Sequence, residues 1–336
     1  MEKLSITWII NQSREKLENK DSRQMAIFHT GVAAAAALVL TALQYLLAEE
    51  IGKTSGLSGM GTRSVLETVQ TVLQWANMVL TPFWSLGFLY AALRWARDSH
   101  ASRSDLLTGF HRWGPCLGLM LNRAVLTICV LVLCTNISSM IYMMTPASEK
   151  IAELAMESGA DMEKMAEILG TMSAAQMEEL LWSMAPLIVI WAVASAAILL
   201  PLLYRFRMAE FVILDEPRAR GLSAMLISGA LLRRRCWQLF RLDLHFWWYY
   251  VLKALCLLIC YADLLLAAFG ISLPIGEDAA YLLTFGLYLI ALFAVEVSFR
   301  PQVDTAYAVT YEGLKAMGPQ QKKPVEQPER MPWDED

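Results

Sequence analysis

LWSMAPLIVIWAVASAAILLPLLY, residues 181–204, is the stretch that decides the fold. It contains no Asp, Glu, Lys, Arg or His, and about 20 such residues in a helix cross the hydrocarbon core of a bilayer. Because the backbone N–H and C=O groups of a lipid-embedded segment must pair within that segment, we expect a helix here. The sequence therefore predicts a membrane span.

Five further apolar stretches of similar length lie before and after this one. They are residues 26–47, 72–93, 117–143, 246–269 and 279–299. They lack the alternation of polar and apolar residues that marks the strands of a membrane barrel. Of the 336 residues, 56% are hydrophobic and 18% charged, whereas soluble domains carry roughly 25% charged residues. We predict an all-α fold, a bundle of six transmembrane helices within residues 26–316.

Lys and Arg residues are distributed unevenly between the segments that flank the spans. The N-terminal segment and the segments after the second, fourth and sixth spans carry 22 of them, and the three other loops carry four. The positive-inside rule therefore places both termini in the cytoplasm, as an even number of spans also requires. We expect a multi-pass protein of the cell (plasma) membrane, with its cysteines reduced because none falls in a predicted outer loop.

The segments between and beyond the spans have distinct compositions. Residues 1–25 are predicted to form a cytoplasmic amphipathic helix on the membrane surface. Residues 145–180 are expected to be an outer helical loop, and residues 205–245 an inner basic loop with an amphipathic helix. Residues 317–336 combine prolines with charges and are predicted to be disordered.

Two helix starts can be read in the outer loop. Thr145 and Pro146 suit an N-cap followed by proline in the first turn. Ser173 and Gln176 have the spacing of a capping box at the start of the fourth span. We therefore expect short helices between the third and fourth spans.

The inner basic loop and two other places carry a recognisable pattern. It consists of an Asp-x-Pro turn, a Ser-led helix, a Leu-Phe-x-Leu-x-Leu run and an aromatic entry to the fifth span, with further matches before the third span and after the sixth. The matching residues are Asp215, Pro217, Ser228, Leu239, Phe240, Leu242, Leu244, Phe246, Asp105, Leu106, Leu107, Phe110, Pro301, Thr305 and Tyr311. The pattern resembles the hallmark region of a bacterial membrane family, the domain of unknown function 975 family.

The resemblance covers most of the chain and implies six membrane helices in a bacterial membrane. It implies no activity. Three positions depart from the family pattern: Arg234 replaces a glycine, His245 replaces a serine, and Trp248–Tyr249 replaces Gly-Trp.

Polar residues share one face of the predicted fifth span. Lys253, Cys256, Cys260 and Asp263 follow one another at helical spacing. They could line a pathway, because ionisable groups inside membranes usually face a bundle interior or a cavity. Alternatively, Lys253 and Asp263 reach opposite membrane surfaces and the cysteines are packing residues. No ligand spacing specific to a metal is present, so we predict no metal site.

The sixth span contains one acidic residue that matches Lys253 in depth. Glu296 lies near the predicted inner end of this span, four residues before Arg300. We predict that Lys253 and Glu296 form an ion pair, since each lone charge there would destabilise the fold by several kcal/mol. A structural pair is expected in preference to a proton relay.

Arg233, Arg234 and Arg235 form the densest basic cluster of the inner loop, close to Trp237 and Trp247. They are candidate contacts for anionic lipid headgroups, which attract basic residues near the inner leaflet. The same loop is a candidate surface for a protein partner. Nucleic acid is not an expected partner, because these aromatics suit the interfacial belt of the bilayer.

No motif of the sequence assigns a reaction or a cofactor. It lacks a phosphate-cradling glycine loop, a His-Glu-x-x-His pair and a Gly-x-Ser-x-Gly elbow, so no catalytic residue is predicted. The leading hypothesis is a non-enzymatic transport-associated or envelope accessory component. One alternative is a small-solute or lipid transporter, with a water-filled cavity reaching Lys253 or Asp263. Another is a membrane-embedded enzyme, with convergent titratable groups beside a cleft open to lipid.

Overall fold

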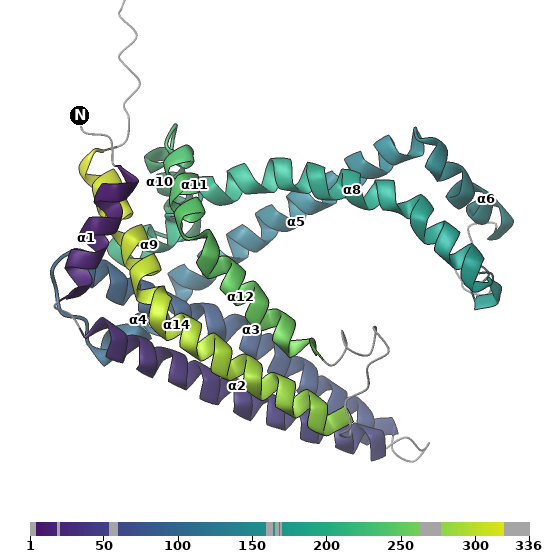
Figure 1. Ribbon diagram of the computed structural model, residues 1–336, viewed down its shortest axis with the longest axis horizontal. Helices are drawn as coiled ribbons and strands as arrows, with labels where there is room; N and C mark the ends of the chain where they lie inside the picture. The colour runs from purple at the N-terminus through teal and green to yellow at the C-terminus, as the bar shows by residue number, and fades with distance from the viewer. Residues whose placement is uncertain are drawn as a thin grey trace, which may run out of the picture. The chain divides into compact units, whose positions relative to one another are not determined.

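A computed structural model describes residues 5–18, 21–53, 60–158, 164, 168, 170–262 and 277–318. These residues form helices joined by turns, and none of them belongs to a β-strand, so the all-α prediction is confirmed (Figure 1). The helices group into two compact units. Unit 1 consists of Met1–Gly118 and Met208–Asp336, and unit 2 of Leu119–Arg207.

Five helices are long and apolar enough to cross a membrane. They are α2 (Ser22–Lys53), α3 (Met60–Ala96), α5 (Trp113–Met143), α8 (Ala174–Arg205) and α14 (Glu277–Ala316). A sixth candidate is the pair α11 (Cys236–His245) and α12 (Trp247–Cys260), which is bent by 59° between its two helices. Five of the predicted spans lie within α2, α3, α5, α8 and α14. The predicted span 246–269 contains α12, and its residues 263–269 lie outside the described residues. The chain is therefore a multi-helix membrane-embedded protein.

The last helix extends well beyond its predicted span. Residues 279–299 were expected to cross the membrane, but α14 continues without a break through Pro301 to Ala316. Its 40 residues make it about 60 Å long at the helical rise of ~1.5 Å per residue. The extension is stable because Tyr307, Ala308 and Leu314 are buried in protein.

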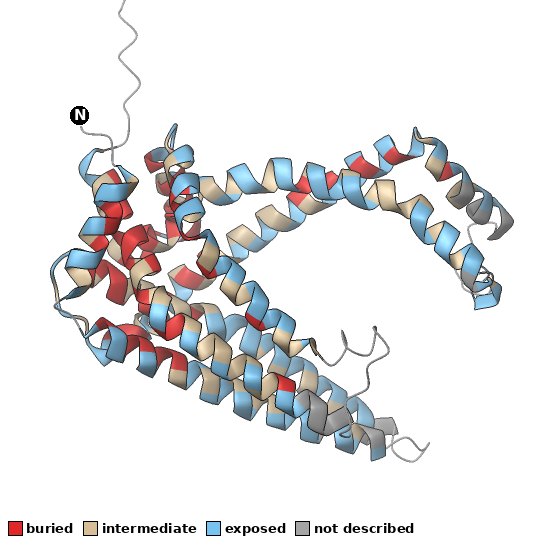
Figure 2. Cartoon of the chain, in the orientation of Figure 1, coloured by how far each residue is buried: buried red, intermediate tan, exposed pale blue. Residues whose placement is uncertain are grey.

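The packed core of unit 1 lies at the end where α3 and α14 stop, which we call the basic end because the predicted basic loops lie there. It is built from α1 (Ile6–Glu18), η2 (Arg103–Leu107), α4 (Thr108–His111), α9 (Ala209–Asp215) and α10 (Gly221–Leu231), with the last half of α14. Figure 2 shows the buried residues gathered at this end. Farther along the spans large apolar side chains such as Met78 and Ile290 are exposed, as expected of lipid-facing surfaces.

The N-terminal helix α1 packs on protein with part of its apolar face. Ile9 is 2% exposed and Ile10 is 7% exposed, because α1 lies against α14, α3 and α11. Residues 1–25 were expected to lie on the membrane surface, so this packing on protein was not predicted. Trp8, by contrast, is exposed and is available to the membrane interface.

The amphipathic segment of the inner basic loop forms two helices, α10 and α11. Met225, Leu232 and Leu239 are buried, whereas Leu222 and Leu226 are exposed. Between the helices Arg234 has a φ of 63°, in the left-handed region that favours glycine. A glycine is the residue expected there from the family resemblance, so this departure places a side chain in a strained backbone conformation.

Two glycines let the segment after α3 approach α3 closely. A Cβ atom added to Gly87 would lie 1.8 Å from the carbonyl oxygen of Leu106, and one added to Gly109 would lie 2.1 Å from that of Phe83. Both neighbours are backbone atoms, which cannot move aside as a flexible side chain can. The contact between α3, η2 and α4 therefore depends on glycine at both positions.

Unit 2 contains most of α5, η3 (Pro146–Ser148), α6 (Glu149–Ser158) and α8. Thr145 is the N-cap of η3 with Pro146 in its first turn, and Ser173 and Gln176 form a capping box at the start of α8, so both predicted helix starts are confirmed. Tyr142 donates its hydroxyl toward the carbonyls of Ala147 and Ser183, at 2.9 and 3.0 Å. This tyrosine ties α5 to η3 and α8.

Candidate functional site

The predicted ion pair within the spans is present in unit 1. Lys253 Nζ on α12 lies 2.7 Å from Glu296 Oε1 on α14, so the prediction of this pair is confirmed. Tyr249, one turn before Lys253, donates its hydroxyl to the same oxygen at 3.1 Å. The side chain of Glu296 is 8% exposed and that of Lys253 is 42% exposed. The carboxylate is thus the enclosed member of the pair.

A second cation shares the same carboxylate. Arg300 Nη1 lies 3.3 Å from Glu296 Oε2, and Arg300 Nε donates to Asp304 Oδ2 at 3.1 Å. Arg300 also donates to Ser85 Oγ on α3 at 2.8 Å, and its guanidinium lies 4.9 Å from the ring centre of Phe88. We call Tyr249, Lys253, Glu296, Arg300 and Asp304 the span network. It holds α3, α12 and α14 together through charges that largely neutralise one another.

His29 on α2 lies next to α3 and extends this polar region. Its ring stacks on Trp84 with centroids 5.0 Å apart, and Trp84 Nε1 donates to the carbonyl of His29 at 3.0 Å. The ring atom His29 Nε2 lies 3.1 Å from the carbonyl oxygen of Trp84. His29 Nδ1 is buried and has no hydrogen-bond partner among the described residues. These contacts fix α2 against α3 at the level of Arg300.

Of the remaining residues on the polar face of the fifth span, the structure describes Cys256 and Cys260. Cys256 is 5% exposed and Cys260 is of intermediate exposure. Asp263 lies outside the described residues. All six cysteines are described, and none of them forms a disulfide. Among the described residues no group of three His, Cys, Asp or Glu side chains could hold a metal ion.

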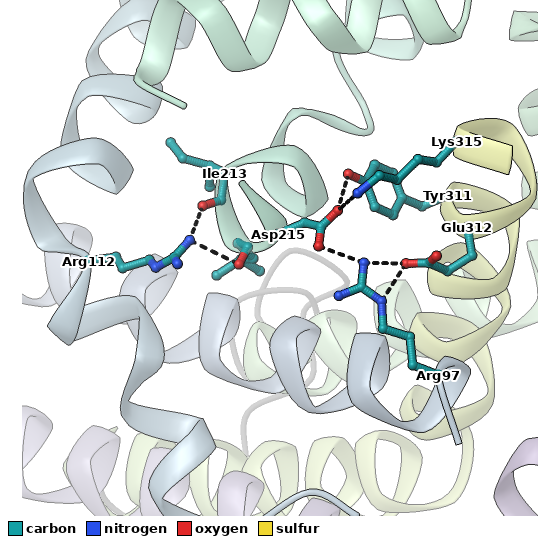
Figure 3. A network of polar contacts seen from close by, with 8 residues as sticks. Arg97, Arg112, Ile213, Asp215, Tyr311, Glu312 and Lys315 are labelled. Atoms are coloured by element: carbon teal, nitrogen blue, oxygen red, sulfur yellow. Dashed lines mark hydrogen bonds and ion pairs between the residues drawn. The ribbon is translucent and has the colours of Figure 1, made fainter. Parts of the chain in front are cut away.

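A second network joins three elements at the basic end (Figure 3). Asp215, the last residue of α9, accepts from Arg97 Nη2 at 2.6 Å, from Tyr311 OH at 2.9 Å and from Lys315 Nζ at 2.5 Å. Arg97 also donates through Nε to Glu312 Oε1 at 2.7 Å. We call Arg97, Asp215, Tyr311, Glu312 and Lys315 the end network. It ties the end of α3 and the end of α14 to α9.

Burial and ion pairing act in opposite directions on Arg97. Partial burial would lower the pKa of its guanidinium, but the hydrogen bonds to Asp215 and Glu312 outweigh this and raise the pKa above its ordinary value. Arg97 therefore stays charged at every physiological pH. Figure 3 also shows Arg112 reaching the last turn of α9, where its Nη1 donates to the carbonyls of Ile213 and Leu214 at 2.8 and 3.0 Å. It thereby caps carbonyls that have no partner within the helix.

The end network contains residues of the family-like pattern and residues that sequence reasoning missed. Asp215 and Tyr311 belong to the pattern, and so does Asp105, which accepts from Arg94 Nη1 through both of its oxygens at 3.0 and 2.9 Å. Arg97 and Lys315 were counted only as topology-setting charges. Arg97 lies 118 residues before Asp215 in the chain, so no local pattern could indicate that they meet.

The candidate lipid contacts lie on an exposed surface of α10 and α11. Arg233 and Arg234 are exposed in the turn between these helices, and Arg235 is partly buried with its Nη1 lacking a hydrogen bond among the described residues. On α11 the exposed apolar side chains share one face at helical spacing: Trp237, Phe240 and Leu244. A stripe of this kind beside arginines is typical of a helix at a membrane interface or a partner surface.

A scan against protein-family models, a search of curated proteins and a search of solved structures found no match to this chain.

Proposed function

We propose that this protein is a non-enzymatic component of a bacterial cell membrane, either transport-associated or an envelope accessory protein, with both termini in the cytoplasm. Its similarity in pattern to the domain of unknown function 975 family is part of this proposal. The basic end would then face the cytoplasm and present the α10–α11 surface to anionic lipid or to a protein partner.

The observation that carries the proposal is the way Glu296 is held. Its carboxylate contacts Lys253, Arg300 and Tyr249, and Arg300 contacts Asp304 in turn. Charges paired in this way fasten helices to each other. The cavity of about 560 Å³ in unit 1 is lined by other residues, so it does not expose this pair to solvent.

A transporter for a small solute or lipid is the second candidate. The observation that favours it is the 42% exposure of the Lys253 side chain, which lies beside Cys256 and Cys260 on α12. If water occupies that side of the helix, Lys253 would line a pathway rather than face lipid or the headgroup region.

Cysteine labelling in membranes separates the two candidates. Variants that each retain one native cysteine are treated with a membrane-impermeant maleimide from either side. We expect Cys236, in the predicted inner loop, to react from one side only, and Cys256 and Cys260 to stay unlabelled from both. Cys129, which is exposed on α5, serves as the control for a thiol in a lipid-facing position.

Labelling of Cys256 or Cys260 at a rate similar to that of Cys236 would contradict the accessory proposal and favour the transporter. Water would then reach the helix face that carries Lys253.

A further inference from the structure

A cavity of about 560 Å³ lies between α1, the start of α2 and the middle of α14. Its lining combines two arginines, two serines, a glutamine and apolar side chains with one acidic residue, Glu18. Cavities of 300 to 1,000 Å³, roughly, are the size that holds small ligands in proteins. The cavity is therefore large enough for a phosphate-bearing group, and its lining carries a net positive charge.

Polar groups in this lining are left without partners. Arg14 on α1 and Arg23 on α2 are exposed, and neither has a hydrogen bond or ion pair with any described residue. Ser22 is only 8% exposed, yet its hydroxyl makes no hydrogen bond to a described residue although the side chain lines the cavity. The hydroxyl is therefore open to a hydrogen bond with water or with a ligand in the cavity.

The start of α2 adds donors at the same place. Ser22 is the first residue of this 32-residue helix, and the first N–H groups of a helix have no acceptor within it. They carry the positive end of the helix dipole, which favours an anion. Arg14, Ser22 and Arg23 thus line one cavity beside the start of α2, and Asp21, which precedes this helix, does not belong to the lining.

Apolar surface leads away from the cavity along both spans. On α2, Ile27 follows Arg23 by one turn and is 45% exposed. On α14, Ala294 and Ile290 precede Ser298 at intervals of four residues, and both are exposed. Residues four apart share a helix face, so an apolar track adjoins the polar cavity on each helix. A soluble anion would have no use for this track, but an acyl chain would cover it.

We propose that this cavity binds the phosphate of an anionic phospholipid, with Arg14, Arg23 and Ser22 as its ligands and an acyl chain along α2 and α14. The site differs from the arginine cluster at 233–235, and it goes beyond the proposed function because it would be occupied in either an accessory protein or a transporter.

The test uses the full-length protein purified in a zwitterionic detergent and titrated with dioctanoyl phosphatidylglycerol, with bound lipid counted by native mass spectrometry. Each arginine should contribute about 1 kcal/mol, so Arg14→Gln/Arg23→Gln should weaken binding roughly 25-fold. The control variant Arg218→Gln/Arg241→Gln removes two exposed arginines of unit 1 that do not line the cavity, and should change binding less than about two-fold.

Three arms of the titration could overturn the proposal. Equal weakening in the two double variants would show a general attraction to positive charge rather than a site. Equal binding of dioctanoyl phosphatidylcholine would show that the negative headgroup is not recognised. Inorganic phosphate displacing the lipid at matched concentration would assign the cavity to a soluble phosphate and not to a phospholipid. Ser22→Ala should weaken lipid binding without altering the melting temperature of the lipid-free protein.

Discussion

Glu296 is the residue on which the span network depends. Its carboxylate is 8% exposed and is shared by Lys253 and Arg300, whereas Lys253 has a side chain that is 42% exposed. Removing the shared anion leaves two cations near each other, and removing Lys253 leaves Glu296 still beside Arg300. Replacing Glu296 should therefore destabilise the protein more than replacing Lys253, although both substitutions break the same ion pair.

We predict that Glu296→Gln destabilises the protein by on the order of 2 to 4 kcal/mol, because Lys253 then loses its carboxylate partner and Arg300 loses one of its two. Lys253→Met should cost about 1 kcal/mol or less, since Glu296 keeps Arg300 as its counterion. Thermal unfolding in detergent measures both variants. The double variant should be no less stable than Glu296→Gln alone, and a Lys253→Met loss as large as that of Glu296→Gln would refute the shared-anion arrangement.

Sequence reasoning succeeded for Lys253 and Glu296 because membrane depth restricts where two charges can meet. Both residues lie in long apolar segments at comparable distances from one end, and lipid offers no alternative partner. Asp215 lies outside such a constraint, and its partners Arg97 and Lys315 are about 100 residues or more away. The end network could be found only once the helices were placed in space.

At the scale of the elements, the close contact between α3 and the η2–α4 segment depends on two glycines, which have no side chain to keep the backbones apart. Gly87 and Gly109 each approach a carbonyl oxygen of the other element within a distance that no Cβ atom tolerates. Arg94 and Asp105 then fix the same two elements by an ion pair at 2.9 Å. A side chain at either glycine should therefore push α3 and the η2–α4 segment apart. The ion pair alone would not keep them in close contact.

We predict that Gly87→Ala destabilises the protein by about 3 kcal/mol, because the backbone of Leu106 must move away from α3. Gly114→Ala is the matched control, since a Cβ atom there would meet nothing within 4 Å, and it should leave stability unchanged or raise it by about 0.5 to 1 kcal/mol. The melting temperatures of the two variants give the comparison. Equal effects would mean that the approach at Gly87 is looser than the structure has it.

Helix existence was predictable for the spans and less so for the short elements. A long apolar segment in lipid must form a helix to pair its backbone N–H and C=O groups, so α2, α5 and α8 can be predicted from composition alone. In contrast, α9 and the last half of α14 carry charged residues beside buried apolar ones, and their burial depends on helices that are distant in the chain, such as α3 for both of them. The stacking of Phe211 on Tyr311, with ring centroids 5.6 Å apart, is an example of a contact that no periodicity encodes.

At the scale of the whole molecule, the orientation in the membrane is open to a direct test. Ser64 precedes the second span and Ser104 follows it, and both are exposed. In a background with Cys236→Ser, we predict that Ser64→Cys reacts with an impermeant maleimide from outside and Ser104→Cys from the cytoplasm, as the distribution of Lys and Arg requires. Labelling of both from the same side would refute the six-span topology.

The uninterrupted helix α14 has a mechanical consequence. Glu296 and Glu312 belong to different networks and are separated by about 24 Å along one helix axis. A tilt of about 5° at the first position displaces the second by about 2 Å, which is enough to break a hydrogen bond of ordinary length. Pro301 lies between Glu296 and Glu312, and a proline is a position where a helix bends readily. A tilt of α14 that follows the loss of the contact between Arg300 and Glu296 would therefore also strain the contacts of Tyr311, Glu312 and Lys315 at the far end of the helix.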